Sequence, residues 1–107
     1  MTKVDINPGV CGLKTRVTAH SDDEQQVTLT VDSGCPAVRA MFEALGSEFD
    51  AYELCLAKPG DGPLYEYARA HFPGHCACPT LAGIAKCVEV ECKLALPRSA
   101  SIEFVQE

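Results

Sequence analysis

The segment QVTLTVDSGCPAVRAMFEAL, residues 26–45, decides the fold because it holds a strand, a turn and a helix in direct succession. Its first seven residues alternate between polar and apolar side chains, the two-residue period of a strand with one buried face. The turn Ser33–Pro36 follows. Proline suits the first position of a helix because its missing N–H would have no partner there. The segment therefore predicts a strand over residues 26–32 and a helix from residue 36.

One apolar stripe marks the helix after this turn. Its apolar side chains recur at i, i+3, i+4 and i+7, the spacing that puts them on one helical face. These side chains are Val38, Met41, Phe42 and Leu45. Gly46 is a natural C-terminal stop. We therefore expect this helix to pack one side against the predicted strand.

The rest of the chain divides into short elements of the same two kinds. The predicted strands cover residues 3–6, 15–20, 26–32 and 101–106. The predicted helices cover residues 36–45, 64–72 and 80–94, and residues 52–57 fit either a short strand or a helical turn. Residues 1–107 are expected to form one domain. The order of elements predicts an α+β, two-layer fold in which about three helices cover one face of a mainly antiparallel sheet.

Composition excludes several classes of protein. With 47% hydrophobic and 22% charged residues the chain has the balance of a globular protein, and no apolar run reaches the roughly 18 residues of a membrane span. The segment Met1–Asp5 has no apolar stretch of the secretory kind, so a cytoplasmic location is expected. The net charge is −6 and the nine basic residues are scattered, which argues against nucleic acid as a partner.

Cysteine is the most informative residue type for function. Seven cysteines in 107 residues are about 6.5%, below the roughly 8–10% of disulfide scaffolds, and the number is odd. A cytosolic chain rich in cysteine more often uses it for metal or redox chemistry than for disulfides. Four of the seven lie in turns rich in glycine and proline: Cys11, Cys35, Cys76 and Cys78.

Two of these cysteines precede predicted helices. Cys35-Pro36 and Cys78-Pro79 each place a cysteine at or next to the N-cap, with proline at the first helical position, where free N–H groups and the helix dipole favour a thiolate. Cys76 and Cys78 are two residues apart, so both sulfurs can ligate one metal ion. Four thiolates are the number taken by structural zinc or by an iron–sulfur cluster. None of the CxxC pairs of zinc ribbons is present, so the fold itself would have to assemble such a site.

The remaining cysteines and the histidines are secondary candidates. His71 and His75 precede Cys76, and either could replace a thiolate in a Cys3His set. Cys92 falls on the apolar stripe of its helix and Cys55 lies between two leucines, so both are expected to be packing residues. Cys87 lies next to that stripe and fits either role.

Two other functions compete with metal binding. In a thiol redox protein or cysteine-nucleophile enzyme, Cys35 or Cys78 would be the nucleophile and a nearby turn cysteine the resolving thiol. In an interaction module, the cysteines would carry no chemistry. The sequence points to no named enzyme reaction. A homodimer is consistent with the pattern because small sheets with exposed edges often pair.

The turns also carry a resemblance. The pieces Asn7–Gly12, Ser33–Cys35, Cys78-Pro79 and Leu94–Pro97 resemble those of a family of small, uncharacterised proteins from anaerobic bacteria and archaea. The resemblance implies a compact α/β domain in an oxygen-poor cytosol and brings no established activity. The leading hypothesis is thus a cytosolic protein that binds zinc or an iron–sulfur cluster for storage, delivery or electron transfer. Its proposed ligands are Cys11, Cys35, Cys76 and Cys78.

Overall fold

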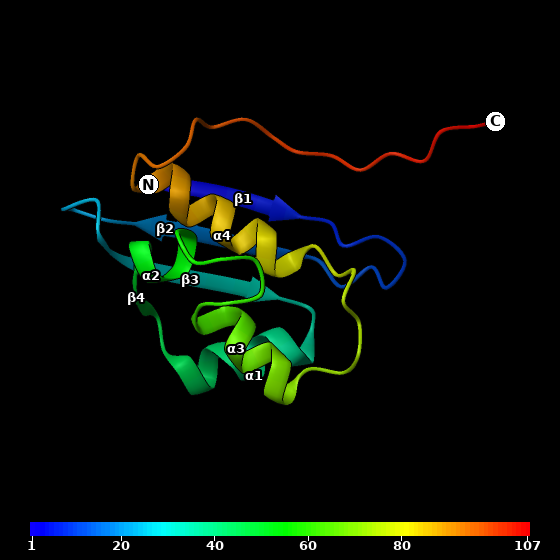
Figure 1. The fold of residues 1–107 in the computed structure, drawn as a ribbon, viewed down its shortest axis with the longest axis horizontal. Coiled ribbons are helices and arrows are strands. Elements are labelled where there is room, and N and C mark those ends of the chain that lie inside the picture. Colours follow the sequence, from blue (N-terminus) through cyan, green and yellow to red (C-terminus); the bar gives the residue numbers. More distant parts are fainter.

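A computed structural model describes residues 1–107 and consists of four strands and four helices (Figure 1). The strands are β1 (Thr2–Ile6), β2 (Thr15–His20), β3 (Gln26–Ser33) and β4 (Glu48–Asp50). The helices are α1 (Pro36–Leu45), α2 (Ala51–Cys55), α3 (Pro63–His71) and α4 (Thr80–Glu91). The predicted α+β fold is confirmed.

The strands form one antiparallel sheet in the order β1-β2-β3-β4. Val17 in β2 lies opposite both Val4 and Val31, and Val27 lies opposite Phe49. Because side chains alternate across a strand, this register gathers the apolar residues on one face. That face carries the core, whereas the other is polar and open to solvent.

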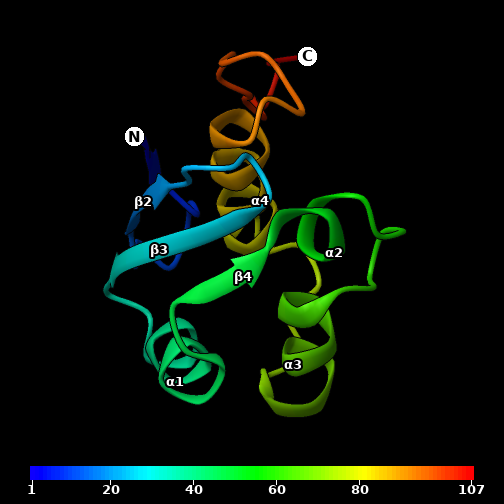
Figure 2. The ribbon, with the colours of Figure 1, turned by 90° about the vertical axis from the view of Figure 1, so that its left-hand side faces the viewer.

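The helices cover the apolar face (Figures 1 and 2). Helix α4 lies across β1 and β2, α1 packs on β3, and the short α2 joins β4 to α4. Met41 of α1 and Ile84 and Val88 of α4 are fully buried, together with Val17 and Val27 of the sheet. Sheet and helices therefore share one hydrophobic core of 15 buried residues.

The segment that decides the fold behaves as predicted. Strand β3 and helix α1 follow one another with only Gly34 and Cys35 between them. Helix α1 ends at Gly46, which has φ of 82° and donates its N–H to the carbonyl of Phe42. A side chain at that φ would be strained, so glycine is the residue that ends the helix here.

The region after α1 corrects two predictions. Residues 48–50 form a strand that the sequence pattern did not predict, and it pairs with the beginning of β3. The segment 52–57, which fitted either a short strand or a helical turn, is helical as far as Cys55, as part of α2, and Asp50 caps this helix by accepting hydrogen bonds from the N–H groups of Tyr52 and Glu53. The helices therefore number four rather than about three.

Helix α4 also differs from its prediction in its boundaries. Pro79 is its N-cap residue, not its first helical residue, and the helix ends at Glu91 rather than at residue 94. Lys93 has a positive φ of 62°, a conformation that an α-helix cannot continue through. The N–H groups of Leu94 and Ala95 both donate to the carbonyl of Glu89, which closes the end of the helix.

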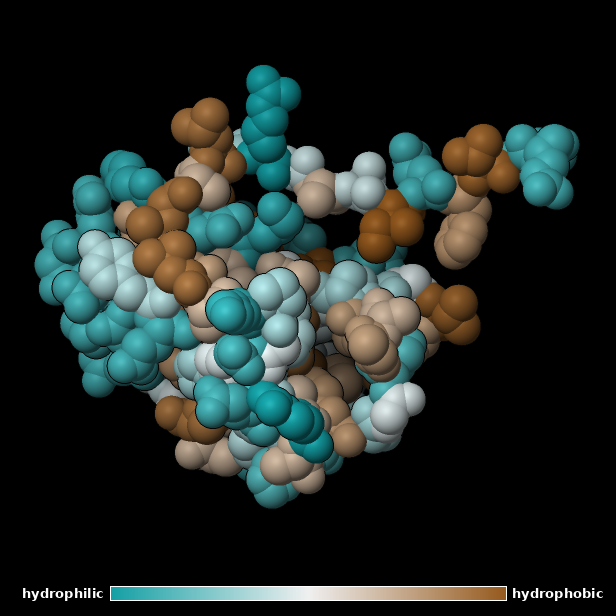
Figure 3. Space-filling model, viewed as in Figure 1, coloured by the Kyte–Doolittle hydropathy of each residue, from teal (hydrophilic) through white to brown (hydrophobic).

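The predicted closing strand at residues 101–106 is wrong for the single chain. Residues 97–107 form neither helix nor strand and run away from the body as an extended tail (Figures 1 and 3). β1 is therefore one edge of the sheet. No helix in the structure has the length and apolar character needed to cross a bilayer.

Candidate thiolate site at one end of the sheet

Three loops lie at the same end of the sheet. Ile6 ends β1, Thr15 begins β2 and Ser33 ends β3, and these residues lie opposite one another in the strand register. The loop between β1 and β2 and the turn after β3 therefore emerge at the same end of the sheet. The loop before α4 lies at this end too, on the right in Figure 1. These three segments contain every cysteine of the predicted site.

The first loop is a tight turn around Cys11. Gly9 and Gly12 both adopt positive φ angles, 101° and 66°, and the N–H of Gly12 donates to the carbonyl of Gly9 at 2.9 Å. The side chain of Asn7 accepts from the N–H of Gly9. Two glycines in the left-handed region explain why this turn is glycine-rich. Cys11 between them is exposed to solvent.

The second turn is fixed to the sheet through Ser33. The hydroxyl groups of Thr15 and Ser33 share a buried hydrogen bond of 2.7 Å, and Ser33 Oγ also accepts from the N–H of Cys35 at 3.1 Å. The N–H of Gly34 donates to the carbonyl of Lys14 at 2.9 Å, which ties this turn to the end of the first loop. Cys35 is half-buried and is the N-cap residue of α1.

The third loop carries two cysteines and is held more loosely. Cys78 donates its N–H to the carbonyl of His75 at 3.3 Å, and its sulfur lies 3.4 Å from the hydroxyl oxygen of buried Thr80. Cys78 is half-buried just before the N-cap of α4, whereas Cys76 is exposed. The loop therefore offers one sulfur next to a helix start and one to solvent.

The structure places the three loops at one end of the sheet but does not bring the four sulfur atoms together. No group of three or more cysteine, histidine, aspartate or glutamate side chains is arranged so that it could hold a metal ion. The two histidines do not complete one: His71 stacks on Tyr67 with ring centroids 4.4 Å apart, and His75 is exposed. The structure thus shows two exposed and two half-buried cysteines at one end of the fold and no assembled metal centre.

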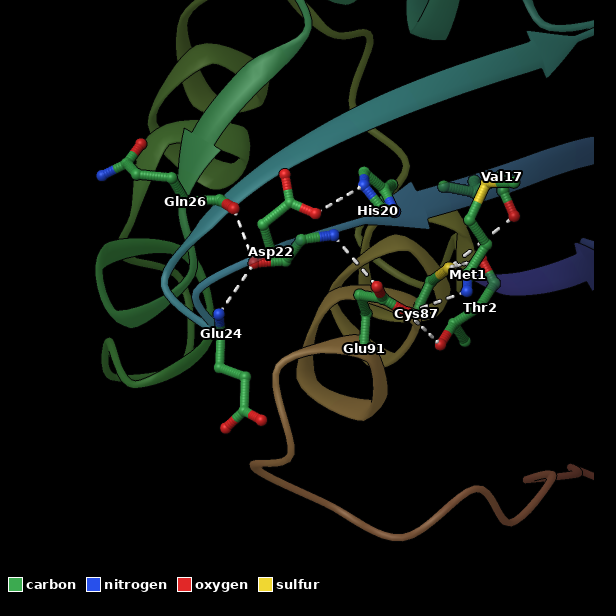
Figure 4. A network of polar contacts seen from close by, with 10 residues as sticks. Met1, Thr2, Val17, His20, Asp22, Glu24, Gln26, Cys87 and Glu91 are labelled. Atoms are coloured by element: carbon green, nitrogen blue, oxygen red, sulfur yellow. Dashed lines mark hydrogen bonds and ion pairs between the residues drawn. The ribbon is translucent and has the colours of Figure 1, made fainter.

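Of the other three cysteines, Cys87 and Cys92 are buried in the core and Cys55 packs half-buried against it. The thiol of Cys87 is buried and lies 3.3 Å from the carbonyl oxygen of Thr2 and 3.6 Å from that of Val17 (Figure 4). Burial raises the pKa of Cys87 to about 11 and that of Cys55 to about 12, and it also raises the pKa of Cys92. The packing role predicted for Cys55 and Cys92 is confirmed, and Cys87, which fitted either role, joins them.

A charged hollow borders the same end of the sheet on its open face. Its volume is about 440 Å³. It is lined by Asp5, Ile6, Asn7, Lys14, Thr15, Arg16 and Asp32. The Arg16 guanidinium donates to both carboxylate oxygens of Asp5, at 2.6 and 2.9 Å. Two of the charged side chains of the hollow are therefore already paired with each other. Sequence analysis missed this hollow because its residues come from three strands, and only their alternation with buried residues could have indicated it.

Comparison with protein families identifies the relatives of this chain. The family described as "Family of unknown function (DUF6951)" matches residues 2–104. The chain belongs to this family. The DUF6951 region includes all four turn cysteines, every strand and helix, and the tail as far as Phe104. No match was found among curated proteins or among solved structures.

Proposed function

We propose that this DUF6951 protein binds a thiophilic metal centre, either Zn²⁺ or an iron–sulfur cluster, through the thiolates of Cys11, Cys35, Cys76 and Cys78. One observation carries the proposal. The seven cysteines fall into two sets: Cys87 and Cys92 are buried in the core and Cys55 packs half-buried against it, whereas the other four lie in loops at one end of the sheet. Cysteines kept only for packing would not divide in this way, because packing favours burial.

The chemistry of the two sets supports this choice of ligands. A metal ligand must be a thiolate, and the raised pKa values of Cys55 and Cys87 keep those thiols protonated at neutral pH. Neither α1 nor α4 has a side-chain N-cap hydrogen bond. The first N–H groups of both helices are thus available to the sulfurs of Cys35 and Cys78, an interaction that stabilises a bound thiolate.

Metal binding would have to draw the loops together. Residues 73–77 donate no backbone hydrogen bond, and the Cys11 turn is tied to the rest of the protein mainly through Lys14. Closure of these loops leaves the strand register and the core intact. Binding of a structural Zn²⁺ by thiolates contributes about 10–16 kcal/mol, which offsets the cost of about 1–2 kcal/mol for each loop residue that it orders.

Metal binding by these thiolates requires a compartment that keeps cysteines reduced. All seven cysteines are free thiols in the structure, the state that a cytoplasm maintains. An oxygen-poor cytosol would also preserve an exposed iron–sulfur cluster. Storage, delivery and electron transfer are the roles that such a centre would serve.

The test is metal analysis of the full chain purified without oxygen, with a visible absorption spectrum to distinguish zinc from a cluster. We expect about one equivalent of zinc or one cluster per chain. Serine substitutions at Cys11, Cys35, Cys76 and Cys78 should each reduce the bound metal. Cys55→Ser is the matched control, because it removes a thiol from the same protein without touching the loops, and it should keep the metal.

Two results would contradict metal binding. The first is a folded protein that stays metal-free after reconstitution with zinc and, separately, with iron and sulfide. The second is full metal content in the four loop variants. Rapid oxidation of Cys35 or Cys78 in a metal-free protein would instead favour the thiol redox function.

A further inference from the structure

The outer edge of β1 is an unpaired strand edge. The sheet begins with β1, which pairs only with β2, and its five residues leave one row of backbone groups without a strand partner. A free edge of this kind is a template for another strand. The opposite edge, β4, is only three residues long and continues directly into α2. Of the two edges, β1 is therefore the one that can accept a further strand.

The tail has the pattern of a strand but no partner. Within residues 97–107 the one backbone hydrogen bond runs from the N–H of Arg98 to the carbonyl of Leu96. The side chains of Ile102 and Phe104 are 83% and 101% exposed, although large apolar residues normally seek burial. Figure 3 shows hydrophobic side chains along this tail, clear of the body.

We propose that residues 101–106 of one chain add as a fifth strand to the free edge of β1 in a second copy of this chain. The addition joins two unsatisfied elements. The edge of β1 gains backbone partners, and the apolar tail residues gain a buried face. The DUF6951 match extends to Phe104, so β1 and the tail as far as Phe104 lie within the region that defines the family.

The side-chain patterns of the two strands match. Val4 and Ile6 point to the helix side of the sheet, and an antiparallel register that pairs Val4 with Ile102 places Ile102 and Phe104 on that same side. There they would cover the half-buried Val4 and the exposed flank of α4, where Val90 is only half-buried. The added strand would thus extend the existing core rather than start a new one.

Charges on the opposite side of the two strands are complementary as well. Lys3 points to the open face and has no carboxylate within 4.0 Å, whereas the neighbouring Asp5 is already paired with Arg16. Alternation puts Glu103 on this open face of the added strand. Lys3 and Glu103 then form a cross-strand pair of opposite charges.

A second copy is a better partner for the tail than its own β1. In the single chain the tail runs in the same direction as β1 and stays clear of it (Figure 1). Pairing within one chain would therefore be parallel, the less stable ladder. Exchange between two copies related by a twofold axis permits antiparallel pairing, and it satisfies two tails and two edges at once.

Sedimentation velocity over a range of concentrations, combined with hydrogen exchange of the tail amides, tests this exchange on the full chain. We expect a dimer in which residues 101–106 become protected as the dimer forms. The variant Ile102→Asp/Phe104→Asp should be a monomer with unprotected tail amides. The variant Ser99→Asp/Ala100→Asp adds the same two charges just before the strand and should remain a dimer.

Charge reversal identifies the partner strand. Lys3→Glu places like charges opposite each other at both copies of the interface and should raise the dimer dissociation constant by about tenfold. Adding Glu103→Lys to Lys3→Glu should return the dimer dissociation constant to that of the unmodified protein. Three results would overturn the exchange: a monomer at every concentration, a monomer with protected tail amides, or a dimer whose stability is unchanged by Ile102→Asp/Phe104→Asp.

Discussion

A methyl group added to Gly83 of α4 would lie 2.6 Å from Cδ1 of Ile6 in β1. It would also lie 2.7 Å from Cγ1 of the same side chain. Real side chains do not approach this closely, so the helix rests on the strand at a distance that glycine alone permits. This contact positions the N-terminal half of α4, and with it the loop that carries Cys76 and Cys78.

Gly83→Ala should therefore destabilise the protein despite its better helix propensity. Alanine in a helix is favoured over glycine by about 1 kcal/mol, but overpacking of a tight contact costs roughly 1–3 kcal/mol. We expect a net loss of about 1 kcal/mol in the free energy of unfolding, measured by urea denaturation. A gain in stability would show that Ile6 moves aside freely.

The effect of Gly83→Ala on the free energy of unfolding should have the opposite sign in a protein that already carries Ile6→Ala. Truncation of Ile6 removes the atoms that would clash and leaves a cavity beside Gly83. Gly83→Ala in that background fills part of the cavity and keeps its helix propensity, so it should stabilise by about 1 kcal/mol. Equal effects in both backgrounds would contradict the direct contact between these two residues.

Ser33 should matter more for stability than its exposed neighbours on β3. Ser33→Ala leaves the buried hydroxyl of Thr15 and the N–H of Cys35 without their partner, and an unpaired buried polar group costs about 2 kcal/mol. Adding Thr15→Val removes the hydroxyl that Ser33→Ala leaves without a partner, and it should recover roughly half of the lost free energy of unfolding. Thr30→Ala, on the open face of the same strand, should change stability by less than about 0.5 kcal/mol. Urea denaturation of the four proteins measures all three effects.

The local features of this fold could be predicted from the sequence because they depend on neighbouring residues. Alternation along Gln26–Ser33 and the stripe of α1 are each complete within a few residues, and so is the turn between them. β4 was missed because its three residues are too few to show a period, and it exists through pairing with β3. The tail was predicted as a strand because its polar and apolar residues alternate. Alternation indicates which side chains share a face, but it does not show whether a neighbouring strand is present to pair with.

The candidate site shows the same division. Glycine and proline around Cys11 and Cys35 correctly indicated turns, and the register of β1, β2 and β3 brings those turns to one end. The positions of the four sulfurs relative to one another depend on loops with few contacts, and no local pattern fixes them. Cys87 could not be assigned because its burial depends on the approach of α4 to β1, which Gly83 sets.

Glu91 should make stability depend on pH. Its carboxylate accepts hydrogen bonds from the hydroxyl of Thr2 at 2.8 Å and from the N–H of Ser21 at 2.9 Å, and so links α4 to β1 and to the turn that follows β2 (Figure 4). Burial alone would raise the pKa of Glu91. The bonds from Thr2 and Ser21 and the positive charges of the N-terminus and His20 outweigh burial, so the pKa lies below its usual 4.5.

A carboxylate with a lowered folded-state pKa stabilises the protein above its unfolded pKa, and this stabilisation disappears as the pH falls through the folded pKa. Glu91→Gln should cost about 2 kcal/mol at pH 7, because hydrogen bonds to a charged group are lost. The difference from the unmodified protein should shrink below about pH 4.5. Glu89→Gln, which removes a charge from the same helix, should show a smaller cost at pH 7; a constant difference for Glu91→Gln across this pH range would contradict the role of its charge.

The two sets of cysteines should differ in reactivity in the folded, metal-free protein. Brief labelling with a maleimide at pH 8, followed by peptide mass spectrometry, should modify Cys11 and Cys76 first and Cys35 and Cys78 more slowly, in the order of their exposure. Buried Cys87 and Cys92 should react only after unfolding, and half-buried Cys55 should react far more slowly than the loop thiols. A pKa of about 12 instead of 9.0 leaves Cys55 with about a thousandfold less thiolate, and the thiolate is the reactive form.

Metal provides the decisive comparison for the same experiment. If the four loop thiolates bind zinc, prior addition of zinc should protect all four from the maleimide and leave the core thiols as they were. Protection of only Cys76 and Cys78 would mean that the loops around Cys11 and Cys35 do not close. Labelling of Cys87 in the folded protein would show instead that α4 separates from β1, because this thiol lies between that helix and the carbonyl groups of Thr2 and Val17.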